Sequence, residues 1–332
     1  MSSFAARLGL LRHPDFPGRP GPVVTPDSAA ELIQHLGFAD QEHSVVLSLD
    51  EQHRLLAIHE PGLGDIESVS SSPRDIVKVP LLVDARSILF AHNHPSGIAT
   101  PSMADLDMNK FVFRLMLGLG MEFDGAIIVA DRGRYTVQQV ERAPRRRPPP
   151  PPPRYVSNAG RPGARARLGA HYGNIEGYLC RTCIVRTRGY DVDNAPVVET
   201  TSDVAALVSQ YVTDHNIVMI GLDAHLRVIA VHETEADDDA ARKIAQVALA
   251  AVCRECVVAQ RMTSGQHDSL RIHEMDDALS LVGVPLRDYI FCTADGEHAS
   301  ALATNRINQP DVSYVLPYEE QVDGAVAYEP VM

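Results

Sequence analysis

An internal repeat constrains this chain more than any other feature. The segment Val45–Glu60 reads V-V-L-S-L-D-E-Q-H-R-L-L-A-I-H-E, and Val218–Glu233 reads V-M-I-G-L-D-A-H-L-R-V-I-A-V-H-E. Later in each half, F-D-G-A-I-I-V-A-D at 123–131 corresponds to R-D-Y-I-F-C-T-A-D at 287–295. Similar segments in the same order indicate a duplicated unit. We therefore expect two copies of one fold.

The segment between the copies has a composition that cannot form a core. It contains six consecutive prolines and, from Arg142 to Ala170, eight arginines with no acidic residue. Consecutive prolines favour a stiff polyproline II rod, which suits a linker or, as the alternative, a ligand for an SH3-like groove. The predicted division of the chain is an N-terminal extension (1–24), a first domain (25–141), a Pro/Arg-rich linker (142–172), a second domain (173–310) and a C-terminal tail (311–332).

Charge and composition narrow the partners. The 332 residues carry a net charge of −13, and without the eight linker arginines the rest carries −21. Such an acidic body repels phosphate backbones, so nucleic acid is expected to contact only the linker. No apolar run reaches the length of a membrane span and no secretory signal is recognisable. Five cysteines, an odd number, favour a cytoplasmic location without a disulfide framework.

In the first copy, predicted strands and helices alternate, which is typical of an α/β domain. The repeat 45–60 predicts a hairpin with its turn at Asp50–His53. Ser72-Pro73 has the form of a helix start, and Pro80 is expected to kink or shorten that helix. The apolar segment S-I-L-F-A (87–91) predicts a strand. A following helix is indicated by apolar residues at helical spacing, namely Leu106, Phe111, Leu115 and Leu119.

The strand 87–91 leads into a candidate metal site. His92 and His94 are two residues apart, so a strand places both imidazoles on the same side. Ser102 is expected to cap the next helix and Asp105 to lie in its first turn, facing the histidines. Two histidines and one aspartate leave a tetrahedral Zn²⁺ with one open position, as in catalytic sites. The alternative is an ordinary capping box beside structural histidines.

The turn after the histidines has its own expected residues. Asn93 and Ser96 are expected to shape it, and Gly97 to permit it.

These residues carry a family resemblance. The pattern H-x-H-x7-S-x2-D, matched by His92, His94, Ser102 and Asp105, resembles the JAMM motif of JAB/MPN metalloproteases. The segment H-N-H-P-S-G followed by T-P-S-x-x-D resembles the RadC-like branch of this family. Three further segments resemble the same branch: the hairpin strand V-V-L-S-L-D, the helix start S-P-R-D and the segment L-G-x-x-F-D-G-A-I-I-V-A. The resemblance covers about residues 25–140.

The resemblance implies a fold and an activity. The fold is a JAB/MPN-like (cytidine-deaminase-like) α/β domain, a mixed sheet flanked by helices. The activity is zinc-dependent hydrolysis of a peptide or isopeptide bond in a protein or peptide substrate, with one Zn²⁺ per chain in the first domain. The resemblance also implies that Glu42 is the general base and that Ser102 donates a hydrogen bond to the oxyanion, with Glu51 and Glu60 as rival bases.

The second copy lacks these ligands. Gln260 and Met262 stand where the first copy has its two histidines, His215 stands where it has Glu42, and an ungapped overlay puts His273 over Asp105. We expect a degenerate JAB-like domain that packs, recruits substrate or dimerises. Two related domains could pair within the chain, or between chains as a homodimer, through equivalent surfaces.

Four cysteines in the second half offer a different metal site. Cys180 with Cys183 and Cys253 with Cys256 form two C-x-x-C pairs, and four thiolates suit a structural zinc. Their 69 intervening residues exceed zinc-ribbon spacing, so core thiols are the favoured interpretation.

Two other functional classes stay open. RadC-like proteins have been labelled DNA-repair proteins, which predicts binding of nucleic acid through the arginine linker. The third class is a metal-binding scaffold without turnover.

Overall fold

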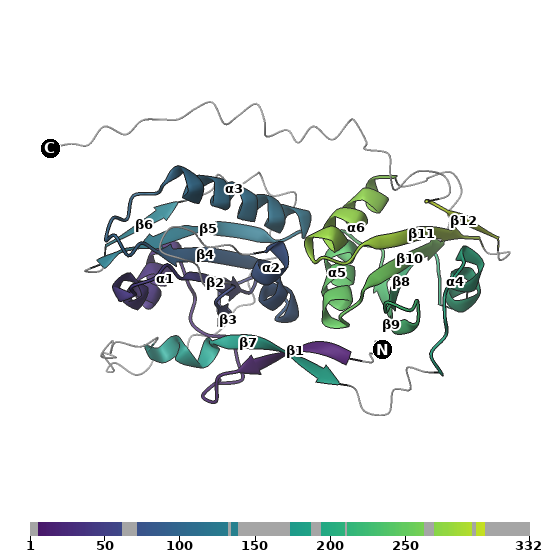
Figure 1. The fold of residues 1–332 in the computed structure, drawn as a ribbon, viewed down its shortest axis with the longest axis horizontal. Helices are drawn as coiled ribbons and strands as arrows, with labels where there is room; N and C mark the ends of the chain where they lie inside the picture. The colour runs from purple at the N-terminus through teal and green to yellow at the C-terminus, as the bar shows by residue number, and fades with distance from the viewer. Residues whose placement is uncertain are drawn as a thin grey trace, which may run out of the picture.

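A computed structural model describes residues 6–61, 72–131, 134–138, 173–186, 194–209, 211–261, 269–293 and 297–302. Two sheet-containing halves lie side by side, with a two-stranded ribbon along both (Figure 1). The expected linker 142–172 and tail 311–332 lie outside the described residues. No helix in the described ranges is both long enough and apolar enough to cross a membrane.

The first half is a mixed five-stranded sheet with helices on both faces. Its elements are α1 (Pro26–Ile33), η1 (Gln34–Phe38), β2 (Ser44–Leu49), β3 (Leu55–His59), α2 (Pro73–Leu82), β4 (Ser87–Asn93), α3 (Met103–Gly118), β5 (Glu122–Val129) and β6 (Tyr135–Gln138). The strand order is β3-β2-β4-β5-β6. Neighbours β4 and β5 run parallel and the other pairs run antiparallel. The expected α/β fold is confirmed.

Short-range signals position these elements. The Asp50 carboxylate accepts hydrogen bonds from the backbone N–H groups of Gln52 and Arg54, which closes the predicted β2–β3 turn. Ser72 caps α2 as predicted. That helix continues through Pro80 and ends two residues later, at Leu82. Of the two expected effects of the proline, the structure is compatible with a shortened helix.

The buried face of α3 differs from the prediction. Leu115 and Leu119 are buried, but Leu106 and Phe111 are 37% and 38% exposed. The buried face instead carries polar residues, because Asp105 faces the histidines and Asn109 donates a hydrogen bond to Gln138 of β6. A helix face that carries polar functional residues is missed when the buried face is predicted from apolar residues alone.

Apart from η1, the second half repeats the order of helices and strands of the first. It contains α4 (Thr201–Val208), β8 (Asn216–Leu222), β9 (Val228–Glu235), α5 (Ala240–Ala250), β10 (Glu255–Arg261), α6 (Ser269–Leu281), β11 (Leu286–Cys292) and β12 (His298–Ser300). The strand order β9-β8-β10-β11-β12 matches that of the first sheet, and so does every strand direction.

Irregularities of the backbone are repeated as well. His53 and Leu226, at equivalent hairpin turns, have φ of 55° and 58°. Asp84 and Val252, after the equivalent helices α2 and α5, have φ of 53° and 57°. A positive φ is unfavourable for a β-branched residue such as valine. Shared strain at matching positions supports an origin by duplication.

The register of α6 corrects the ungapped overlay. Gly120 and Gly283, both with positive φ, follow α3 and α6 at equivalent points before the next strand. Counting back from them places His273 over Lys110 and Asp268 over Asp105, so the second copy keeps an aspartate at that position although both histidines are replaced. Residue 268 lies outside the described residues.

The halves pack through equivalent helices. Helix α2 contacts α5, and α3 contacts α6. One hydrophobic cluster includes Leu81 and Met116 from the first half together with Ile244 from the second. Two ion pairs cross the contact: the Arg86 guanidinium donates two hydrogen bonds of 3.1 Å to Asp239, and Arg242 Nη1 lies 2.5 Å from Asp84 Oδ1.

A two-stranded ribbon lies outside both sheets, and the sequence analysis did not predict it. Strand β1 (Ala6–Arg12) pairs antiparallel with β7 (Cys180–Arg186), which follows η3 (Gly173–Tyr178). β7 contacts β3 and α2 of the first half, whereas β1 also contacts α5 of the second. The ribbon thus joins the expected extension to a segment expected in the second domain.

Candidate metal centre

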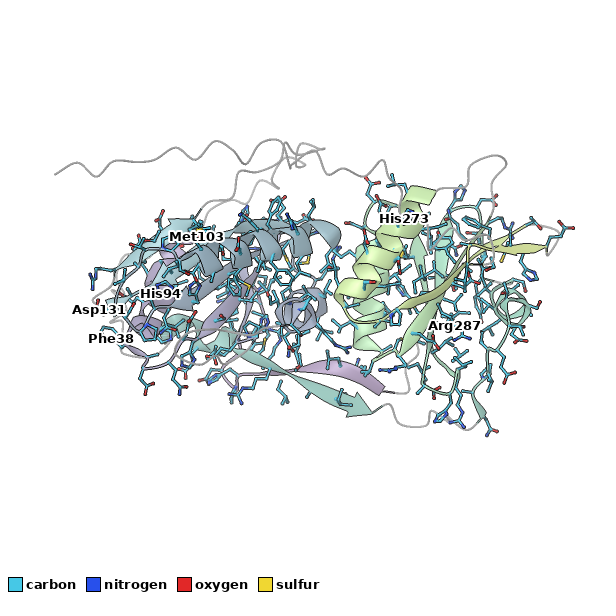
Figure 2. The ribbon with its side chains drawn as sticks, turned by 45° about the horizontal axis from the view of Figure 1, so that its top comes forward. Phe38, His94, Met103, Asp131, His273 and Arg287 are labelled. Carbon is cyan, nitrogen blue, oxygen red and sulfur yellow. The ribbon has the colours of Figure 1, made fainter. Side chains whose placement is uncertain are left out.

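The centre lies where β4 ends. His92 is inside the strand, between Ser44 of β2 and Ile128 of β5. His94 follows the strand, and its backbone N–H still bonds Val129 O at 2.9 Å. Gly97, with φ of 74°, turns the chain as predicted. Figure 2 shows His94 near Met103 and Asp131, at the end of the first half away from the described second half.

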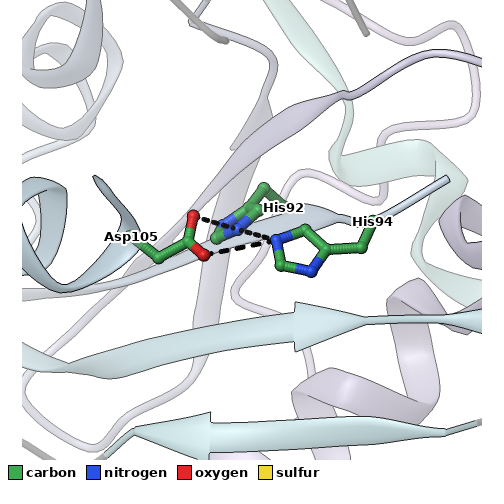
Figure 3. Close-up of side chains that lie close together, drawn as sticks. All are labelled: His92, His94 and Asp105. Atoms are coloured by element: carbon green, nitrogen blue, oxygen red, sulfur yellow. Dashed lines mark hydrogen bonds and ion pairs between the residues drawn. The ribbon is translucent and has the colours of Figure 1, made fainter. Parts of the chain in front are cut away.

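The three predicted ligands meet (Figure 3). His92 Nε2 lies 3.1 Å from His94 Nε2 and 2.9 Å from Asp105 Oδ1, and His94 Nε2 lies 3.4 Å from Asp105 Oδ2. Ligand atoms on a tetrahedral zinc are about 3.3 Å apart, given bonds of about 2.0–2.1 Å. In the part of the chain that the structure describes, this is the one group of His, Cys, Asp or Glu side chains close enough to share an ion.

Asp105 is held in its charged form. The Ser102 backbone N–H and hydroxyl donate hydrogen bonds of 2.6 and 2.7 Å to Asp105 Oδ2, and the hydroxyl accepts one from the Asp105 N–H, which completes a capping box. Burial raises the pKa of Asp105, but the bonds from His92 and Ser102 outweigh it and keep this pKa well below its usual value. A carboxylate is the form that binds a cation.

His94 is fixed in the tautomer that a metal needs. Its Nδ1 lies 2.7 Å from the carbonyl oxygen of Ile98. A carbonyl only accepts, so Nδ1 carries the hydrogen and Nε2 presents its lone pair to His92 and Asp105. The residues therefore fit a divalent cation with nitrogen and oxygen preferences, such as Zn²⁺.

Glu42 borders the same group. Burial raises the pKa of this carboxyl, the neighbouring imidazoles of His92 and His94 act to lower it, and the Asp105 charge acts to raise it. Ser44 pairs with His92 in the sheet, and Glu42 precedes Ser44 by two residues, so Glu42 lies at the end of the sheet that carries the ligands. The rivals lie elsewhere. Glu51 pairs with Arg86 at 3.3 Å, at the opposite end of β4, and Glu60 follows the edge strand β3, which β2 separates from β4.

The four-thiolate site is wrong. Cys180 packs with Ala57 and Val79 beneath the first sheet, whereas Cys253 and Cys256 belong to the core of the second half. Burial raises the pKa of Cys180 to about 11 and that of Cys253 to about 12, so both stay protonated. Apolar surroundings account for these cysteines as core thiols, the interpretation that sequence favoured.

The equivalent position in the second half has different contacts. Gln260, at the place of His92, accepts a hydrogen bond of 2.6 Å from the Tyr289 hydroxyl. Met262 lies outside the described residues.

Asn93 has a role that the sequence did not indicate. The sequence predicts that it shapes the turn, but its side-chain amide instead bonds the backbone of residues 41 and 43, just before the neighbouring strand β2. The signal available was its position: in a strand, the residue between two ligands points away from them.

Comparison with known proteins agrees with this geometry. A family model for the RadC-like JAB domain matches residues 23–142. A UPF0758 protein of Histophilus somni (strain 2336) is 42% identical over 93 residues, which are 28% of this chain and 42% of that protein. A UPF0758 protein of Vibrio cholerae is 42% identical over 84 residues, 25% of this chain and 54% of that protein.

A more distant relative extends the matched region. A UPF0758 protein of Desulforudis audaxviator is 32% identical over 117 residues, 35% of this chain and 51% of that protein. The chain thus spans about half the length of these relatives, or less. The family match ends at residue 142 and does not include the second half. The relation of the second half to the first therefore rests on the sequence repeat and the shared strand order. Residues 23–142 of this chain belong to the RadC-like JAB domain family.

Proposed function

We propose that the first half is a zinc-dependent hydrolase that cleaves a peptide or isopeptide bond in a protein or peptide substrate. The observation that carries the proposal is the set of three ligating side chains, whose N and O atoms lie 2.9–3.4 Å apart, at the end of the sheet where Glu42 precedes β2. Bound Zn²⁺ supplies Lewis acidity, which polarises a carbonyl and acidifies water.

Each residue has a proposed task. His92, His94 and Asp105 hold the ion. Glu42 accepts a proton at its carboxylate from the attacking water and returns it to the leaving amine nitrogen, as a general base and then acid. Ser102 orients Asp105 through its hydroxyl, and rotation of that hydroxyl would allow it to donate to the oxyanion.

The rest of the chain has supporting roles in this proposal. We propose that residues 194–302 are a degenerate JAB-like copy that stabilises the active half through the α2–α5 and α3–α6 contacts. All five cysteines are free thiols, which agrees with a cytoplasmic protein. The described body carries no feature that favours DNA binding over hydrolysis.

The test is a cleavage screen with zinc-loaded protein on quenched fluorescent peptides, including lysine isopeptides. Wild type should cleave some of them, and Glu42→Gln should lower the rate about 10²–10⁴-fold. Glu51→Gln is the matched control and should stay close to wild type. Full zinc occupancy without any cleavage would support the scaffold instead, and equal rates for Glu42→Gln and wild type would refute the assigned base.

A further inference from the structure

The side chain of Asn93 binds both peptide groups that flank Glu42. Asn93 Oδ1 accepts a hydrogen bond of 2.7 Å from the N–H of His43, and its Nδ2 donates one of 3.0 Å to the carbonyl of Gln41. The Gln41 carbonyl belongs to the peptide before Glu42, and the His43 N–H belongs to the peptide after it. One fully buried amide therefore fixes the backbone on both sides of the proposed base.

The hydrogen bonds of the Asn93 side chain take the place of backbone pairing between β4 and the segment before β2. Strand β2 begins at Ser44, and the bond of 3.3 Å from Asn93 N to His43 O is the last backbone link between β4 and this segment. Beyond it, the polar backbone groups next to Glu42 need other partners. The Asn93 amide uses one donor and one acceptor side by side, as a peptide group does, so it extends the hydrogen-bond ladder by one step.

The same strand therefore holds the ligands and the base. Alternation along β4 directs His92 and His94 to the metal side and Asn93 away from them, toward the 41–43 segment. Asn93 lies between the two histidines in sequence, so its two hydrogen bonds link the backbone beside Glu42 directly to the strand that carries the ligands.

The second half provides an internal comparison. Arg261 stands where the first half has Asn93, and His215 where it has Glu42. Arg261 Nη2 bonds Val212 O at 3.0 Å, and its Nη1 lies 3.7 Å from Asp214. At these two equivalent positions the second half thus has neither the amide nor the carboxylate that it would hold.

We propose that Asn93 is a positioning residue that holds Glu42 at a fixed place relative to the metal ligands. The inference rests on the proposed role of Glu42 as the base. Its structural part, the clamp, is measurable without turnover.

The test compares Asn93→Ala, Asn93→Asp and the control Ser96→Ala in the full chain loaded with Co²⁺. Ser96 lies in the neighbouring turn, where its hydroxyl accepts a bond from Ile98 N–H. The readouts are Co²⁺ affinity, the visible Co²⁺ spectrum and amide hydrogen exchange at His43. Asn93→Asp keeps the acceptor for His43 but loses the donor to Gln41, so it separates the two halves of the clamp.

We expect Asn93→Ala to keep Co²⁺ affinity within about threefold, since no ligand is removed. Exchange at His43 should accelerate about tenfold or more, because its acceptor is gone. The Co²⁺ spectrum should change as it does in Glu42→Gln, while Ser96→Ala matches wild type. In Asn93→Asp, amide hydrogen exchange at His43 should stay as slow as in wild type, because the acceptor is kept.

Two outcomes overturn the proposal: wild-type exchange and spectrum in Asn93→Ala, or loss of Co²⁺ binding in a folded Asn93→Asp. With any peptide found in the screen, kcat should fall about 10²-fold with KM little changed, as for a displaced catalytic group. If Glu42→Gln cleaves normally while Asn93→Ala still frees His43, the base assignment fails and the clamp stands.

Discussion

Gly118 and Leu281 are the last residues of the equivalent helices α3 and α6, and they face each other between the two halves. A Cβ added at Gly118 would lie 2.8 Å from Leu281 Cδ1. Two leucines at this pseudo-symmetric point would collide, so glycine opposite leucine favours pairing of unlike halves.

The contact between Gly118 and Leu281 predicts what a larger side chain at position 118 would do. Gly118→Leu should lower the free energy of unfolding by about 1–2 kcal/mol through overpacking. Leu281→Ala added to it should recover most of the loss, because the shorter side chain makes room. Urea unfolding of the two single variants and the double variant measures this coupling, and strict additivity would contradict the contact.

The two ion pairs between the halves should differ in strength. Arg242 is 3% exposed, and its nearest carboxylate is that of Asp84, whose side chain is 67% exposed; Asp239 lies farther from it, at 3.8 Å. The side chains of Arg86 and Asp239 are each 33% exposed, so neither partner of that pair is buried. Asp84→Asn should therefore cost about 1–2 kcal/mol, since it leaves a buried guanidinium without its closest anion. Asparagine also tolerates the positive φ at this position.

Arg86→Gln is the comparison for that variant. Pairs in which both charges reach solvent contribute less than about 1 kcal/mol, and salt screens them further. Thermal melting in low and high salt separates the two cases. An Arg86→Gln effect larger than that of Asp84→Asn would contradict the ranking.

His59 predicts a pH dependence of stability. Burial lowers the pKa of this histidine from 6.5 to about 4. The unfolded chain then binds the proton more readily between these values, so stability is complete above pH 6.5 and is lost as pH falls toward 4, by up to about 3 kcal/mol.

His59→Gln should remove that slope. The amide of glutamine can still donate to the Asp75 carbonyl, which the ring nitrogen contacts at 3.1 Å. Melting temperatures at pH 7, 5.5 and 4.5 test this, with the exposed His225→Gln as control. A wild-type slope retained in His59→Gln would assign the effect to other groups.

Local patterns and the internal repeat predicted much of this protein, because their causes are local. Alternation put His92 and His94 together, and the capping box put Asp105 beside them. The repeat predicted a second sheet with the same strand order.

Features made by contacts far apart in sequence were not predictable. β1 pairs with a strand more than 160 residues away, and no pattern specifies such a partner. The clamp by Asn93 spans 50 residues and depends on which strands become neighbours. The exposure of Phe111 follows from polar residues that α3 turns toward the sheet and the site.

Zinc content per folded chain tests the central claim most directly. Wild type should hold about one zinc, whereas His92→Ala and Asp105→Asn should hold well below that at the same free zinc concentration, since each loses a ligand. Glu42→Gln and Cys253→Ser should both keep about one. Full zinc in folded His92→Ala, or its loss in folded Cys253→Ser, would contradict the account.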